Sequence, residues 1–147
     1  MSNTLGLCTG VAAAVTGGAF LTYSTFTMSA IRRLDAPAAV TAMRAVNVAA
    51  PRSVLFMAFL FLPGVAAVPI AILDGAGLLR LGATVYFLGV IGVTTIFHVP
   101  RNTRLESSPF DDAVRSWPAW SRSWVAGNHV RTVCGMAAGV LIVLGSA

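Results

Sequence analysis

Two groups of strongly polar residues stand beside long apolar stretches, and these residues could carry chemistry. The first group closes one apolar stretch and the second opens the next: His98 and Asn102, then Asn128, His129, Arg131 and Thr132. A charged or strongly polar side chain that faces hydrocarbon is costly, so such residues usually face other helices or mark a functional site. Imidazole exchanges a proton near neutral pH, which makes His129, and after it His98, a candidate proton acceptor.

The second group spreads widely around a helix. At about 100° per residue its four members cover a sector of about 160°, so they all face inward only if protein surrounds that helix. We expect both groups to meet in a shared polar chamber, because consecutive spans run antiparallel. A plainer explanation stays open, in which Arg131 extends to the membrane interface and Asn128 caps the helix.

The composition indicates that a membrane positions these groups. Of 147 residues, 56% are hydrophobic and 10% are charged, whereas a soluble domain carries about 25% charged residues. The mean hydropathy of +0.80 agrees. Crossing a hydrocarbon layer takes roughly 20 helical residues, and four stretches suffice: residues 5–31, 53–73, 81–99 and 125–146. The sequence predicts one all-α domain over residues 1–147, an integral membrane four-helix bundle with short interfacial helices in the first and third loops.

An aspartate and several prolines predict helix boundaries in the first half of the chain. Asp35 is expected to cap a short helix that has Pro37 in its first turn and ends before Pro51. Pro63 and Pro69 lie inside the second span, where each removes a backbone donor and predicts a kink. Neighbouring helices can satisfy the carbonyls that such prolines leave free.

Other turn signals divide the second half. Residues 74–77 predict a tight turn between the second and third spans, and Pro100 is expected to end the third span. Pro109 and Pro118 then predict that the following polar segment is broken into short pieces.

Three tryptophans in that segment, Trp117, Trp120 and Trp124, stand at i, i+3 and i+7 and share one helix face. They predict either an aromatic belt at the membrane interface or the wall of a pocket.

Glycine pairs at GxxxG spacing, Gly6 with Gly10 and Gly135 with Gly139, let helix backbones approach closely. They would serve packing within the chain or a homo-oligomer equally well.

The basic residues are all arginines, and their distribution predicts an orientation. The first and third loops hold eight of the ten, and Arg80 alone lies between the second and third spans. The eight are Arg32, Arg33, Arg44, Arg52, Arg101, Arg104, Arg115 and Arg122. Because positive loops stay in the cytoplasm, we expect a cell-membrane protein with both termini outside. Arginines between apolar runs suit a lipid bilayer as partner and no nucleic acid.

Residues 120–132 read WSRSWVAGNHVRT and resemble the signature of the anthrone oxygenase-like family, where an aromatic residue and a tryptophan precede Asn-His-x-Arg-Thr in the last span. Residues 98–102, HVPRN, are similar to the family's Asn-x-Pro-x-Asn element, with His98 in place of the first asparagine. The family's first-loop pattern resembles this chain at Arg32, Arg33, Leu34, Met43 and Asn47. The resemblance follows the whole chain in span order.

The resemblance implies a monooxygenase of polyketide biosynthesis that uses no cofactor and converts an apolar, anthrone-like aromatic to a quinone with O2. A base would remove a carbon-bound proton, and hydrogen-bond donors would stabilise the enolate oxygen. On this hypothesis His129 is the catalytic base, and the other catalytic residues are Arg131, Asn102, Asn128 and His98. The substrate-binding residues are Asn47, Trp120, Trp124 and Thr132.

Two other functions stay open at this point. His98 and His129 with a carboxylate such as Glu106, Asp111 or Asp112 would make a copper, iron or zinc site, although their spacing matches no metal motif. A transporter or scaffold subunit is the second alternative, but proton-coupled transporters usually place a carboxylate within a span, and here every carboxylate lies in or beside a loop.

Overall fold

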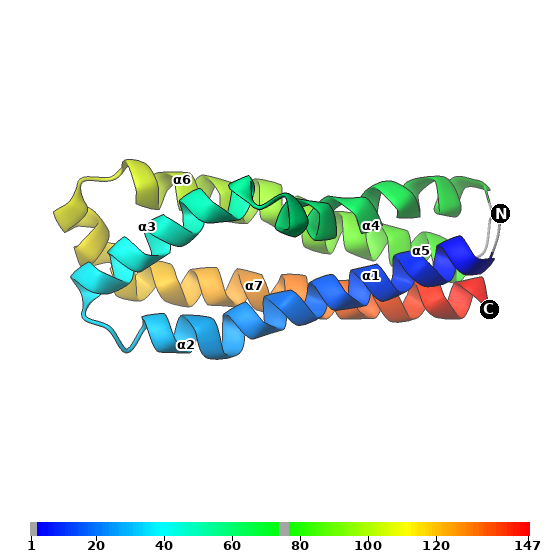
Figure 1. The fold of residues 1–147 in the computed structure, drawn as a ribbon, viewed down its shortest axis with the longest axis horizontal. Coiled ribbons are helices and arrows are strands. Elements are labelled where there is room, and N and C mark those ends of the chain that lie inside the picture. Colours follow the sequence, from blue (N-terminus) through cyan, green and yellow to red (C-terminus); the bar gives the residue numbers. More distant parts are fainter. Residues whose placement is uncertain (1–2, 74–76) are drawn as a thin grey trace.

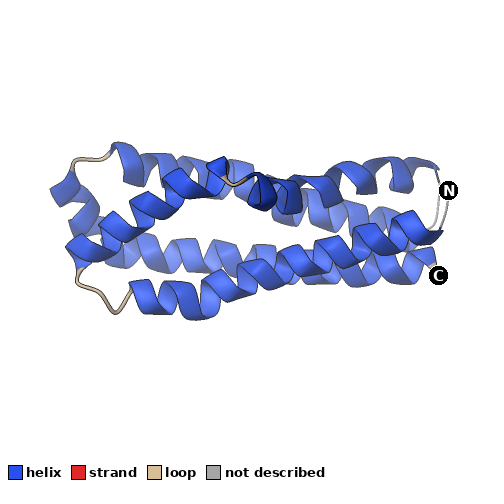
Figure 2. Cartoon of the chain, viewed as in Figure 1, coloured by secondary structure: helices blue, strands red, loops and turns tan. Residues whose placement is uncertain are grey.

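The structure, a computed structural model, describes residues 3–73 and 77–147. Over these residues the fold is all-α, as predicted, and contains no strand (Figure 2). In chain order the helical segments are α1 (Asn3–Thr22), π-helical η1 (Tyr23–Thr27), α2 (Met28–Ile31), α3 (Ala36–Arg52), α4 (Val54–Leu73), α5 (Gly77–Tyr86), π-helical η2 (Phe87–His98), α6 (Val99–Ser107) and α7 (Phe110–Ser146). Residues 74–76 of the expected turn lie outside the described residues.

Long apolar helices confirm that the chain is a membrane protein. Asn3–Ile31, Gly77–Ser107 and Phe110–Ser146 are each long and apolar enough to cross a bilayer. Ala36–Arg52 and Val54–Pro69 qualify only together, as a pair bent by 63°. The described part of the chain therefore has three spans, or four if the bent pair counts as one.

The helices of the second half are longer than predicted, because neither Pro100 nor Pro118 ends one. Pro100 stands just after the junction of η2 and α6, which follow each other without a gap, and the helix continues through it from Gly77 to Ser107. Pro118 lies inside α7 on its exposed side, where a lost hydrogen bond costs least. With 37 residues α7 is about 55 Å long, whereas the hydrocarbon layer is about 30 Å thick. The helix is therefore longer than a single crossing of that layer requires.

The predicted start of α3 is confirmed, and its predicted end, before Pro51, is two residues too early. Asp35 caps the helix, since its Oδ1 accepts a hydrogen bond of 2.9 Å from the Ala38 N–H. The helix passes through Pro51 and stops at Arg52, and extended Ser53 makes the bend to α4.

Neighbouring helices satisfy the carbonyl that Pro63 leaves free in α4. Pro63 lacks the N–H that would bond to the Phe59 carbonyl four residues earlier. The Thr16 hydroxyl donates to that oxygen at 2.7 Å, and the buried Tyr86 hydroxyl donates to the adjacent Leu60 oxygen at 2.9 Å. The helix α4 runs through Pro63 without a break.

The helices α1 and α7 pack backbone to backbone along the membrane part of the molecule (Figure 1). A Cβ at Gly139 would lie 2.7 Å from the Gly10 oxygen, and one at Gly135 would lie 2.9 Å from the Gly17 Cα. Because these are closer than real Cβ contacts, only glycine fits there. The predicted glycine pairs thus serve packing within the chain, and they give no support to a homo-oligomer.

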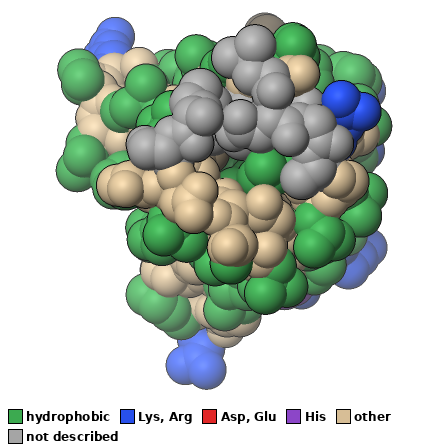
Figure 3. All heavy atoms as spheres, turned by 90° about the vertical axis from the view of Figure 1, so that its right-hand side faces the viewer, with side chains coloured by type: hydrophobic (Ala, Val, Ile, Leu, Met, Phe, Trp, Pro, Cys, Tyr) green, Lys and Arg blue, Asp and Glu red, His purple; other side chains and the backbone are tan. Residues whose placement is uncertain are grey.

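Buried side chains form separate cores at the two levels of the molecule. We call α2, α3, α6 and residues 110–124 of α7 the head layer; it lies at the end opposite the N and C labels (Figure 1). Its core is formed by Met28, Ala39, Val40, Met43, Leu105, Ala113, Trp117 and Trp124. The membrane bundle has its own core of Ala13, Phe20, Leu60, Tyr86, Val90 and Ala138. Seen from the end that carries the termini, the surface is mostly hydrophobic side chains and backbone (Figure 3).

Arg44 links α3 to the C-terminal end of α6 by hydrogen bonds. Its guanidinium donates to the Leu105 oxygen from Nε at 3.1 Å and from Nη2 at 2.8 Å, and to the Ser108 oxygen at 2.7 Å. Leu105 is in the last turn of α6 and Ser108 is its C-cap, so the cation lies at the C-terminal end of the helix, where it interacts favourably with the helix dipole.

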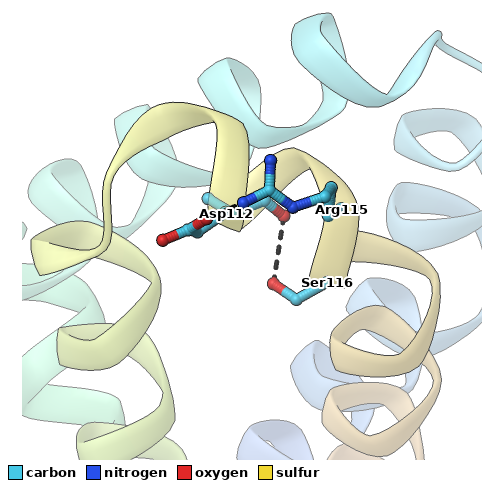
Figure 4. Close-up of polar contacts among 4 residues, drawn as sticks. Asp112, Arg115 and Ser116 are labelled. Carbon is cyan, nitrogen blue, oxygen red and sulfur yellow. Dashed lines mark hydrogen bonds and ion pairs between the residues drawn. The ribbon is translucent and has the colours of Figure 1, made fainter.

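The start of α7 is stabilised by local contacts. Asp111 and Asp112 occupy its first turn, where acidic groups suit the helix dipole. Arg115 pairs with Asp112, and the Ser116 hydroxyl donates to the Ala113 oxygen at 3.1 Å (Figure 4). Both members of the ion pair are exposed, so the pair contributes little to stability.

Candidate active site at the junction of the two layers

A cavity of about 370 Å³ lies where the head layer meets the membrane bundle. Its wall takes Met43 and Trp124 from the head core and Phe20 and Leu60 from the membrane core. This volume is at the small end of pockets that hold drug-sized ligands. The polar residues in its lining include Asn47, Thr94, His98, Asn102, Glu106 and Arg131.

His98, the last residue of η2, is 1% exposed and lines the cavity. Its ring stands edge to face against Phe97, with centroids 5.3 Å apart, and against Trp124, at 5.0 Å. A Cβ at Gly127 would lie 3.1 Å from His98 Nε2, so this glycine makes room for the imidazole. Among the described residues neither ring nitrogen makes a hydrogen bond of good geometry, and the Gly127 backbone is the polar group close to the ring.

Arg131, 5% exposed, is the charged group of the site. Its Nη1 donates to the Thr94 hydroxyl at 3.2 Å and its Nη2 to the Asn128 side-chain oxygen. The guanidinium carbon lies 4.2 Å from the Phe20 ring centre. Over the described part of the chain, Arg131 Nε has no acceptor. The buried position rules out the alternative in which Arg131 extends to the interface.

Asn128 holds Arg131 against α1. It is fully buried in the middle of α7, so the alternative role as a helix cap is wrong. Its Nδ2 donates to the Phe20 oxygen at 2.7 Å and to the Ser24 hydroxyl at 2.6 Å, which leaves its Oδ1 to accept from Arg131. Thr132 is buried beside it and donates to the Asn128 backbone oxygen at 3.1 Å.

The tryptophans line α7 from the head layer down to the cavity. Trp120 stacks between Trp117 and Trp124, at centroid distances of 5.5 and 6.3 Å. Trp124 lines the cavity and donates from Nε1 to the Asn102 side-chain oxygen at 3.1 Å. Trp120 is half-buried, donates to the Arg101 oxygen at 3.2 Å and does not line the cavity.

His129 is exposed and does not line the cavity, which corrects the expectation that the whole second group faces inward. Asn128, Arg131 and Thr132 stand at i, i+3 and i+4 and share the buried face of α7. His129 is turned about 100° from Asn128, beside exposed Val130. Protein does not surround α7 on that side, so His129 loses the position that a base would need.

The structure therefore brings together five of the nine predicted site residues around one cavity: Asn47, His98, Asn102, Trp124 and Arg131. Asn128 and Thr132 lie directly behind Arg131. Only Trp120 and His129 stand apart from the cavity and from Arg131.

Sequence reasoning missed two hydroxyl residues that complete the arrangement. Thr94 receives the Arg131 hydrogen bond, and Ser24 receives one from Asn128. A signal existed for Thr94, since it precedes His98 by four residues and so shares its helix face. Ser24 lies in an apolar stretch rich in small residues, and no spacing singled it out.

The residues of the metal hypothesis are not assembled. His98 lines the cavity, whereas His129 is exposed outside it. Within residues 3–73 and 77–147, no three His, Cys, Asp or Glu side chains lie close enough to hold a metal ion.

Comparisons of the chain with models of protein families, with curated proteins and with solved structures give no match.

Proposed function

We propose that this chain is a membrane-embedded oxygenase that acts without a bound cofactor on an apolar aromatic carbon acid of the anthrone type. One observation supports the proposal most: His98, Arg131 and Asn47 each keep a buried polar atom without a partner among the described residues, beside one apolar cavity. Buried polar atoms are nearly always hydrogen-bonded. A ligand with a carbonyl and an acidic C–H group would supply the missing partners.

The chemistry begins with proton transfer to His98. Of the two histidines, His98 lines the cavity, so it takes the role that the sequence assigned first to His129. Removing a proton from the carbon opposite the ketone gives an enolate, whose negative charge lies mainly on oxygen. Asn47, Asn102 and Arg131 line the cavity, and their amide and guanidinium groups are the donors that would stabilise that oxygen.

The enolate then reacts with O2. A carbon–oxygen bond forms at the deprotonated carbon, and the peroxide oxygen takes the proton back from His98 to give a hydroperoxide. Loss of water, which carries away the second hydrogen of that carbon, leaves a second ketone. One oxygen atom stays in the product and the other leaves as water, so the substrate CH2 loses four electrons and O2 gains four. An apolar cavity favours this step, because it keeps bulk water away from the reactive anion.

We also propose an orientation in the cell membrane, with the head layer in the cytoplasm and both termini outside. Eight of the ten arginines belong to residues 32–52 and 101–122, at the head-layer end, and Arg80 follows the start of α5 near the opposite end. The positive-inside rule supports this placement. An apolar substrate and O2 both dissolve in the bilayer, which is the natural supply for a cavity at this depth.

The experiment compares His98→Gln with His129→Gln in the full chain reconstituted in lipid nanodiscs. Quinone formation and O2 consumption are measured with anthrone as probe, after subtraction of the rate in empty nanodiscs. We expect His98→Gln to lower turnover by roughly 10²- to 10⁴-fold, the usual contribution of a general base, and His129→Gln to leave it unchanged. If His98→Gln turns over anthrone as fast as the wild type and His129→Gln do, His98 is not the base. A wild-type rate no higher than that of empty nanodiscs would refute oxygenation of this probe.

A further inference from the structure

Arg131 is a buried cation without an anionic partner. In the described part of the chain no carboxylate forms an ion pair with it, and its acceptors are the neutral oxygens of Thr94 and Asn128. Burying an unpaired charge is costly, above all at membrane depth. Proteins keep such residues where the charge serves a function.

The surroundings fix the guanidinium but leave one of its three nitrogens without an acceptor among the described residues. Thr94 and Asn128 occupy its two terminal nitrogens, and the Phe20 ring lies 4.2 Å from its central carbon. Asn128 is itself fixed through the Phe20 oxygen and Ser24. What remains is Nε, buried and without an acceptor within the described residues, on a side chain that lines the cavity.

We infer that the cavity binds its ligand as an anion, with one ionised oxygen, carboxylate or phenolate, paired with Arg131 and a compact apolar body between α3, α4 and α7. The inference rests on the proposed function for the place of the ligand, and it adds the charge of the ligand to it. A ligand anion would provide the charge compensation that the protein leaves out. The volume of about 370 Å³ suits a small ring system and is too small for a whole phospholipid with two acyl chains.

The other charged group in the lining is consistent with this assignment. Glu106 is exposed at the head-layer side of the cavity and makes no ion pair with Arg131. Its carboxylate would repel an anion on that side, so the anionic oxygen belongs beside Arg131 and the apolar body toward α3 and α4.

The test uses calorimetric titration of the reconstituted full chain with 2-naphthoate and with 2-naphthamide, which share a ring system and differ in charge. We expect naphthoate to bind at least tenfold more tightly than naphthamide in nanodiscs of neutral lipid. Charge-assisted hydrogen bonds of this kind are worth on the order of a tenfold to hundredfold change in affinity. Equal affinities in the wild-type protein would overturn the inference without the need for any variant.

Variants then locate the charge. Arg131→Gln should abolish the preference for naphthoate and leave naphthamide binding within about threefold, and Arg131→Lys should keep part of the preference, because it keeps the charge. Arg101→Gln is the matched control: Arg101 also lies over an aromatic ring, 3.8 Å from the Phe97 centre, but does not line the cavity. If Arg101→Gln removes the preference as fully as Arg131→Gln does, the site assignment is wrong.

A third arm distinguishes the source of the anion. Oleate is titrated in the same nanodiscs, and naphthoate is titrated again in nanodiscs that contain phosphatidic acid. Tight, Arg131-dependent oleate binding would identify a membrane amphiphile as the ligand, and weak oleate binding would identify a compact aromatic acid. Both outcomes support an anion site, whereas competition by phosphatidic acid that survives Arg131→Gln would contradict it. Charge-selective binding without any oxidation of anthrone would refute the oxygenase and leave this inference standing.

Discussion

Among the single residues, Trp124 connects the parts of the candidate site. Its ring touches His98 edge to face at 5.0 Å and lies 5.7 Å from the Arg131 guanidinium carbon, and its Nε1 donates to Asn102. An indole is apolar over its face and has one donor at its edge. It can therefore wall an apolar cavity and fix an amide at the same time.

The side-chain oxygen and nitrogen of Asn102 have different roles, and substitutions can separate them. The oxygen accepts from Trp124 at 3.1 Å, and the amide nitrogen is available to a ligand oxygen. We expect Asn102→Asp to keep the bond to Trp124 and to lower turnover of anthrone by about tenfold or more, since the donor is lost. Thermal unfolding in detergent should change little.

Asn102→Ala is the companion variant, which removes both atoms. It should lower turnover as far as Asn102→Asp does and also destabilise the fold by about 1–3 kcal/mol, because it leaves a buried indole N–H unpaired. Wild-type turnover in Asn102→Asp would show that the residue only positions Trp124.

At the level of elements, irregular helices shape the site. The π-helical segments η1 and η2 stand on either side of Arg131: Ser24 in η1 contacts Asn128, and Thr94 in η2 contacts Arg131. π-Helical geometry is frequent at functional sites, and here η1 (5 residues) and η2 (12 residues) change the phase of the helices that begin with α1 and α5, where polar side chains face α7. Prolines act similarly in α4, where other helices replace a missing backbone donor.

The proline contact yields an element-scale prediction. Thr16→Val should lower the free energy of unfolding in detergent by about 1 kcal/mol, since the Phe59 oxygen loses its 2.7 Å bond. In a Pro63→Ala background the new backbone N–H can bond to Phe59, so the same substitution should cost clearly less. A double-mutant cycle measures the difference directly. Strict additivity of Thr16→Val and Pro63→Ala would mean that Thr16 does not replace the lost donor.

Much of this fold could be predicted from the sequence, and the failures have physical reasons. Apolar stretches and Asp35 predicted the helices and one cap, because composition and local hydrogen bonds determine them. Pro100 and Pro118 were expected to end or break helices, but the helix continues through both, because a helix can tolerate the loss of one backbone hydrogen bond. His129 was misplaced because a polar residue on an apolar helix predicts no direction; only the packing of α1 and α5 on α7 decides which side is buried.

At the level of the whole molecule, the structure has two levels with separate cores and a cavity between them. The head layer is too far along α7 to lie within the same hydrocarbon layer as the last turns of that helix, given its length of about 55 Å. A ligand in the cavity would touch both levels. Binding should therefore couple the head layer to the membrane bundle.

The orientation gives a whole-molecule prediction, made with single cysteines in a Cys8→Ser, Cys134→Ala background. Thr4, in the first turn of α1, and Ser116, in the first part of α7, are both exposed, and the starts of these two helices lie at opposite ends of the molecule (Figure 1). A membrane-impermeant maleimide should label Thr4→Cys in intact cells and Ser116→Cys only in inverted vesicles. The reverse result would invert the proposed orientation, and labelling of both from one side would contradict the span arrangement.

The long helix α7 has a consequence for how the chain tolerates change in length. Trp117 sits in one core, Arg131 at the cavity, and Gly135 and Gly139 against α1, all on one uninterrupted rod. Inserting a single amino acid after Ala126 would rotate the rest of the helix by about 100° relative to the part before it. Gly135 and Gly139 would then no longer face α1, whereas Trp117 would keep its place in the head core. Relatives of this chain should therefore vary freely in the loops before α3 and α7 and almost never gain or lose a residue between Trp117 and Gly139.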